Sequence, residues 1–109
     1  MKMKNDKVYI DQILDSIRKI ELFVNGVDKE NFLENSLVQS AVIMQLTLIG
    51  EVSKKISDDL KKKVALPWKE IAGFRDKAIH NYFDINLDVV WDTIAIDLPP
   101  LKEGLQKIS

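Results

Sequence analysis

The chain has 109 residues with 16 basic and 17 acidic side chains, so its formal charge is −1 at pH 7 and no overall positive field draws it to nucleic acid. A chain of this length buries about two-thirds of the surface that its unfolded form exposes, which predicts one domain, residues 1–109, without covalent crosslinks. It contains no cysteine and a single histidine, which excludes disulfides, thiolate-bound zinc, a cysteine nucleophile and a multi-histidine metal site within one chain.

The first predicted element is an amphipathic helix over residues 6–24. Apolar residues recur there at steps of three and four positions, with charged residues between them, which is the pattern of a half-buried helix. Asn25–Gly26 should end it. Asp28 can cap a short connecting helix, in which Phe32 and Leu33 are expected to point inward.

A second long helix is predicted over residues 36–62, with Ser36 as its cap. Residues 41–49 are apolar nearly all the way round, and such a helix must be covered on every side. We therefore expect a second copy of the chain to pack against it, although a central helix of one chain would give the same pattern. Lys61–Lys63 are expected to form a solvated last turn that suits the helix dipole.

The remaining chain predicts two more helices. Pro67 should open one of them at its first position, with Trp68, Ile71 and Phe74 as its apolar anchors. Asp84 and Asn86 supply a turn. The final helix then carries one apolar stripe, made of Leu87, Val90, Trp91, Ile94 and Leu98. Pro99–Pro100 should kink or restart this helix. Because no strand signal is present, the predicted fold class is all-α, an up-down four-helix bundle with a short extra helix.

The stretch from Arg75 to Tyr82 carries the candidate chemistry. Arg75 offers a permanent cation that can bind a phosphate through two donors, and His80 is the one side chain here that titrates near neutrality. On an ideal helix Asp76 lies one i,i+4 step from His80, where it could accept a hydrogen bond and fix the tautomer of the imidazole. Arg75 and His80 would point about 140° apart on a straight helix, so we expect the helix to end near His80.

Each of these residues also has a more ordinary interpretation. Arg75 could be a surface ion-pair partner of Asp76 or Glu70, which contributes little energy. His80 could be a partly exposed or capping residue near a helix end. Tyr82 could be a core aromatic residue with its hydroxyl at the rim. Asp76 could be an ordinary solvated helix residue. Spacing alone leaves these alternatives open.

Several short motifs resemble, in their order along the chain, those of a known family. They are Asp11–Leu14, Ile49–Glu51, Pro67–Trp68, Ile71–Gly73, Arg75–Asp76, His80–Tyr82, Val90–Trp91 and Leu98–Leu101. On these residues the chain is similar to the HepT-like toxins of the HEPN superfamily, which are paired with a small MNT-type nucleotidyltransferase antitoxin. The similarity spans nearly the whole chain.

The resemblance implies a HEPN-like helical fold and specific roles for the central stretch. Arg75 and His80 would be the ribonuclease pair, and Asp76 the polar residue that commonly follows the arginine. Tyr82 would be the residue that the antitoxin silences by adding AMP groups. The implied partners are a second copy of the chain in a homodimer, the cognate antitoxin and an RNA substrate.

The predicted function is that of a metal-independent endoribonuclease toxin that cleaves tRNA or mRNA without a cofactor. Attack by a ribose 2′-hydroxyl needs a base, an acid and a cation, and one chain has one histidine. A symmetric dimer with two such stretches facing one cleft would supply two. The alternatives are a non-catalytic module that binds the nucleotidyltransferase and a plain dimerisation bundle. No signal peptide and no apolar run long enough to cross a bilayer is recognised, which predicts a soluble, cytoplasmic protein.

Overall fold

The computed structural model describes residues 2–81 and 83–109. Its helices are α1 (Lys2–Phe23), α2 (Lys29–Glu34), α3 (Ser36–Ser53), α4 (Asp58–Lys63), α5 (Trp68–Ala72), α6 (Phe74–Ala78), α7 (Leu87–Asp92) and α8 (Leu98–Ile108). A π-helical segment, η1 (Thr93–Asp97), joins α7 to α8. Strands β1 (Ile79–Asn81) and β2 (Asp84–Ile85) form an antiparallel hairpin between α6 and α7. The all-α fold class is confirmed.

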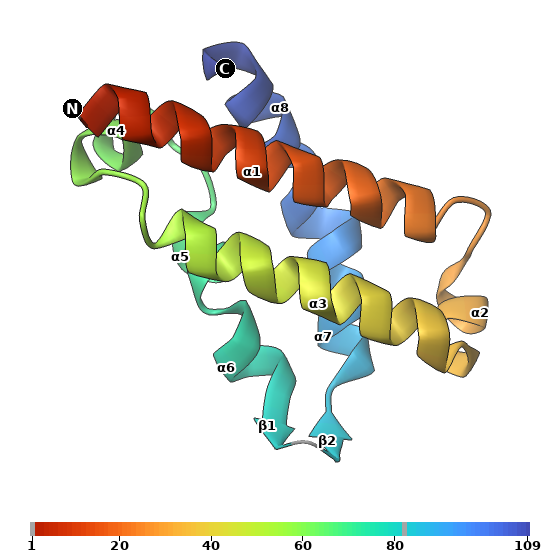
Figure 1. Ribbon diagram of the computed structural model, residues 1–109. Helices are drawn as coiled ribbons and strands as arrows, with labels where there is room; N and C mark the ends of the chain where they lie inside the picture. Colours follow the sequence, from red (N-terminus) through yellow and green to blue (C-terminus); the bar gives the residue numbers. More distant parts are fainter. Residues whose placement is uncertain (1, 82) are drawn as a thin grey trace.

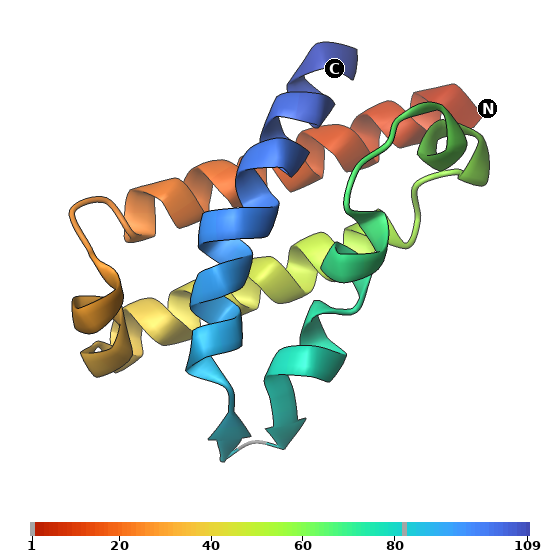
Figure 2. The ribbon, with the colours of Figure 1, turned by 180° about the vertical axis from the view of Figure 1, so that it is seen from behind.

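The two longest helices, α1 and α3, lie side by side and run in opposite directions (Figure 1). The continuous segment formed by α7, η1 and α8 crosses one side of this pair, as Figure 2 shows from behind. The hairpin projects from the end of the molecule farthest from α1 in both views. The core therefore lies between α1, α3 and the α7 to α8 segment, and the hairpin stands outside it.

Aliphatic side chains and two phenylalanines fill this core. The fully buried ones include Ile13, Ile17, Ile20, Phe32, Leu46, Ile49, Ile71, Leu101 and Leu105. Phe32 lies against Trp91, with ring centroids 5.2 Å apart, a separation at which tilted aromatic rings attract each other. Leu33, which was also expected inside, is exposed, because in this short helix only one side faces the core.

Polar caps explain where the first helices begin and end. Gly26 has φ of 75°, a backbone conformation that favours glycine, and it follows α1 as predicted. Asp28 caps α2, since its carboxylate accepts a hydrogen bond from the amide of Asn31 at 2.8 Å. Asn35, and not Ser36, caps α3. The prediction was wrong by one residue because both types can cap a helix.

The predicted helix over residues 36–62 is in fact two helices, because a tertiary contact fixes the break. Ser57 caps α4 by accepting a hydrogen bond from the amide of Leu60 at 3.2 Å. Buried Asp6 of α1 in turn accepts hydrogen bonds from the amide and the hydroxyl of Ser57, at 2.8 and 2.6 Å. The second helix therefore starts where α1 holds the capping serine.

The third predicted helix is also divided, at Gly73, into α5 and α6. Pro67 stands at the capping position of α5 and not at its first helical position. Ile71 and Phe74 are buried as predicted, and Trp68 is partly buried. The hairpin that follows corrects the expectation that no strand is present. Its strands have only three and two residues, too few to show an alternating pattern.

The final helix changes its winding just before Pro99–Pro100, as expected. Prolines have no backbone N–H, so two carbonyls of the preceding turn lose their α-helical donors. The chain forms π-helical hydrogen bonds there: the amide of Leu98 donates to the carbonyl of Thr93, five residues earlier. The helix thereby continues as α8 and buries Leu101 and Leu105.

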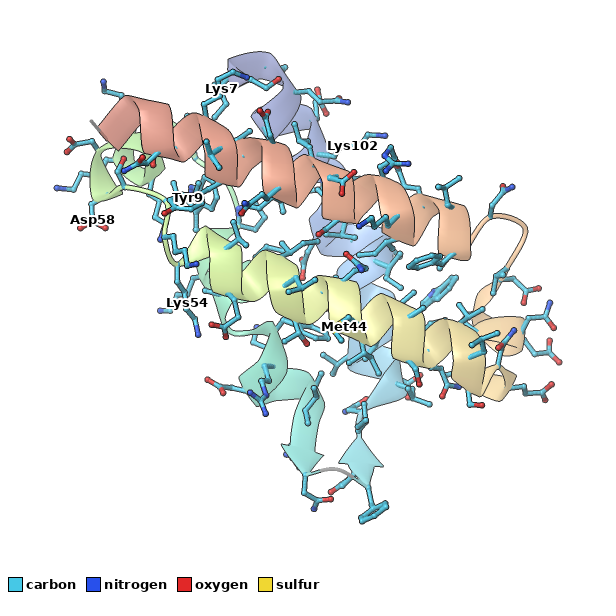
Figure 3. The ribbon with its side chains drawn as sticks, in the orientation of Figure 1. Lys7, Tyr9, Met44, Lys54, Asp58 and Lys102 are labelled. Atoms are coloured by element: carbon cyan, nitrogen blue, oxygen red, sulfur yellow. The ribbon has the colours of Figure 1, made fainter. Side chains whose placement is uncertain are left out.

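Helix α3 is the most apolar element. By length and composition alone it could span a membrane, contrary to the expectation from the sequence, but the core helix of a soluble protein passes the same test. Here α3 packs against α1, α2, α5 and α6. Its opposite side exposes Leu37, Met44 and Leu48 by 80%, 60% and 43%, and Figure 3 labels Met44 near the middle of the helix.

Candidate functional site

Helix α6 and strand β1 position Arg75 and His80. The helix ends at Ala78, because Ile79 takes an extended conformation with φ of −114° and ψ of 104°. The carbonyl of Ala78 accepts a hydrogen bond from the amide of Asn86 at 2.7 Å, which ties the base of the hairpin to the start of α7. The expectation that the helix ends near His80 is confirmed.

This change from helix to strand brings Arg75 and His80 to one hollow of about 230 Å³, which Ile79 and Asn81 complete. Arg75, His80 and Asn81 are all exposed to solvent. Among the described residues, no carboxylate forms an ion pair with Arg75, so the interpretation of Arg75 as a surface ion-pair partner finds no support. The hollow can receive an anion beside a group that exchanges protons.

Asp76 does not take the position that an unbroken helix would give it. Because α6 ends at Ala78, His80 no longer lies one helical turn beyond Asp76. Within the part of the chain that the structure describes, the two side chains share no hydrogen bond or ion pair, and Asp76 does not line the hollow. The predicted hydrogen bond between Asp76 and His80 is therefore wrong, because the helix that would have brought the two side chains together ends at Ala78.

Tyr82 lies outside the described residues, so its predicted modification by AMP stays a prediction. On its C-terminal side Phe83 is exposed by 100%. The side-chain carbonyl of Asn81 accepts a hydrogen bond from the amide of Phe83 at 2.8 Å, a contact typical of asparagine in turns. We did not predict either residue as part of the site, although an asparagine next to a predicted turn is a signal for a contact with the amide two residues later.

The neighbouring charges leave Arg75 as the cation of the hollow. The other basic residue of α6, Lys77, lies outside the hollow. Burial raises the pKa of the Asp97 carboxyl in η1; the charges of Glu70 and Asp92 raise this pKa further, and the charge of Lys77 opposes them. Lys77 thus acts on the Asp97 carboxyl, while Arg75 lines the hollow beside His80.

Across residues 2–81 and 83–109, no three or more histidine or acidic side chains are placed to hold a metal ion together. The groups that the hollow itself offers are a guanidinium, an imidazole and an amide. These groups bind phosphate oxygens and transfer protons.

Comparison with known proteins gives a consistent result. A family model described as ribonuclease HepT-like matches residues 13–108. A protein of Thermococcus cleftensis named "Probable ribonuclease HepT" is 40% identical over 106 residues, covering 96% of either chain. A "Putative RNase" of Methanocaldococcus jannaschii is 38% identical over 109 residues, covering 99% of this chain and 94% of the relative. Another, of Caldanaerobacter subterraneus, is 35% identical over 107 residues, covering 97% and 96%. No solved structure matches.

Proposed function

The chain belongs to the ribonuclease HepT-like family, and on that premise we propose that it is a metal-independent endoribonuclease and the toxin of a type VII toxin–antitoxin pair. Its substrate would be a single-stranded region of tRNA or mRNA in the cytoplasm. The observation that carries the proposal is the solvent-open hollow shared by Arg75 and His80. Its residues can bind a phosphate and move a proton, which are the two tasks of phosphodiester cleavage.

In the proposed reaction one imidazole takes the proton from a ribose 2′-hydroxyl as its oxygen attacks the neighbouring phosphorus. The new bond closes a 2′,3′-cyclic phosphate, and the bond from phosphorus to the 5′-oxygen breaks. A second imidazole, in its protonated form, gives its proton to that leaving oxygen. The guanidinium of Arg75 binds the phosphate oxygens on which charge develops.

A homodimer would provide both imidazoles, since each chain has one histidine. The exposed apolar side of α3 supports this part of the proposal. Leu37, Met44 and Leu48 lie seven and four positions apart in the sequence, so they form one stripe along the helix. Exposed stripes of this kind mark surfaces that bind another protein, and here the proposed occupant is a second copy of the chain.

The catalytic proposal is tested with purified protein and RNA in excess EDTA. The wild-type protein should cleave, and His80→Ala and Arg75→Ala should each lower the rate by roughly 100-fold or more, because a proton-transfer group or an oxyanion donor is lost. Lys77→Ala, which removes a cation outside the hollow, is the matched control and should retain activity. A wild-type protein that cleaves no better than His80→Ala would contradict the proposal. If His80→Ala also left host toxicity unchanged, a non-catalytic module that binds the nucleotidyltransferase would be favoured.

Silencing by AMP groups on Tyr82 is the second part of the proposal. AMP adds negative charge and acceptor oxygens two residues from His80 in the sequence, where they would compete with the RNA phosphate for Arg75. Mass spectrometry of the toxin purified with its nucleotidyltransferase partner should show added AMP, and Tyr82→Phe should show none. An unmodified tyrosine in a neutralised pair would indicate steric masking instead.

A further inference from the structure

A second hollow, of about 240 Å³, lies beside the hairpin that carries His80. Its lining comes from the hairpin, the start of α7 and the first half of α3, and consists of Phe83, Ile85, Leu87, Gln39, Ser40 and Ile43. The first hollow and this one are thus built on one hairpin, since β1 contributes residues to the first hollow and β2 to the second.

Phe83 is the most unusual residue of this second hollow. Its side chain is completely exposed, although burying a phenylalanine side chain stabilises a folded protein. The hydrogen bond from its amide to the side chain of Asn81 holds the turn that presents the ring. Asn81 also lines the first hollow, so one side chain connects the phosphate-binding residues to the exposed ring.

The lining of the second hollow has the chemistry that a nucleobase requires. Phe83, Ile85 and Leu87 offer apolar surface for the flat face of a base. Gln39 and Ser40 add polar groups to the same lining, and the amide of Gln39 is held in place because its nitrogen donates to the carbonyl of Phe32 at 2.9 Å. Aromatic stacking combined with polar contacts to the base edge is how proteins recognise single-stranded RNA.

The two hollows lie near each other along the hairpin. His80 and Phe83 are three residues apart in the sequence, and an extended chain of that length spans at most about 10 Å, so one short stretch of RNA can reach both. We propose, as an extension of the ribonuclease function proposed above, that the second hollow binds a base of single-stranded RNA. This base stacks on Phe83 while the neighbouring phosphate lies against Arg75 and His80.

An RNA base fits these observations better than a protein partner. Asn81 and Asp84, on either side of this turn, are exposed and polar, while Ile43, Ile85 and Leu87 are already half-buried. A protein anchor more often lies at the centre of a wide apolar patch. The first hollow contains Arg75, whose positive charge complements the phosphates of RNA.

The test measures RNA binding in a His80→Ala background, so that it does not depend on cleavage. A short single-stranded RNA labelled with a fluorophore is titrated with protein, and anisotropy gives its Kd. Adding Phe83→Ala should weaken binding about 5- to 100-fold, the range expected for loss of one stacked base. Phe83→Trp should retain binding. Its tryptophan fluorescence, after subtraction of the signal of the His80→Ala parent with its two native tryptophans, should fall on addition of single-stranded but not double-stranded RNA.

Phe23→Ala is the matched control, because it removes another exposed phenylalanine that lines neither hollow. Its Kd should equal that of the His80→Ala parent. Equal RNA affinity of the Phe83→Ala protein would overturn the inference, and so would a Phe83→Ala protein that becomes monomeric, since Phe83 would then anchor a second copy. The two proposals can also fail separately. If the wild-type protein cleaves no RNA but binds it through Phe83, the proposed ribonuclease function is contradicted and this inference still holds.

Discussion

At the scale of single residues, the site depends on a change of backbone conformation between Arg75 and His80. Two residues five positions apart point in different directions on a helix, so their spacing was enough to predict that the helix ends between them. The partner proposed for His80 could not be predicted in this way, because Asp76 reaches it only if the helix continues. Phe83 was missed because the exposure of its side chain depends on the hairpin, which the local sequence does not reveal.

Asp97 gives a residue-scale prediction about pH. Burial, followed by the charge of Glu70, raises the pKa of its carboxyl above the ordinary value of 3.8. The stability that the protonated group contributes is therefore complete below the unfolded pKa and is lost as the pH rises through the folded pKa. Asp97→Asn should raise the Tm at pH 7 and leave it nearly unchanged at pH 3, as measured by thermal unfolding. Exposed Asp92→Asn should produce a smaller rise, and an equal Tm of the Asp97→Asn and wild-type proteins at pH 7 would contradict the assignment.

At the scale of helices and strands, the sequence predicts which elements form better than it predicts where they end. The apolar pattern of residues 36–62 continues past the true end of α3, because amphipathic spacing carries no information about a contact with a distant helix. Asp6 and Ser57 are joined by two hydrogen bonds, yet they are far apart in the chain. The prolines, in contrast, act on their own helix, so the change of winding before α8 was predictable.

The Asp6 to Ser57 contact yields a prediction at this scale. Asp6→Ala should lower the free energy of unfolding by about 1–3 kcal/mol, because two donors of Ser57 lose a buried charged acceptor. Urea unfolding followed by circular dichroism measures this change. The control is Asp11→Ala on the same helix, which removes an exposed ion pair with Lys7 and should change the free energy of unfolding by less than about 1 kcal/mol. Equal losses in the two variants would show that the cap on α4 contributes no special stability.

At the scale of the whole molecule, the apolar side of α3 and the single histidine are the two features on which the proposed homodimer rests. Met44 lies on that side and is exposed by 60%. A charge there costs the folded monomer little, but it would be buried without a partner in a dimer formed through α3. Met44→Glu should therefore fold normally, sediment as a monomer in analytical ultracentrifugation and lose RNA cleavage, since a site with one histidine lacks either its acid or its base.

Leu22→Glu provides the control for this assembly, because Leu22 on α1 is exposed by a similar 62% and lies outside the stripe. It should remain a dimer with wild-type activity. A dimeric Met44→Glu protein would place the interface on another face. If the wild-type protein is a monomer and still cleaves RNA, the reaction needs no second histidine, and the acid must come from the same chain. Sedimentation thus tests where the two copies meet, and cleavage by the same samples tests whether the reaction needs both copies.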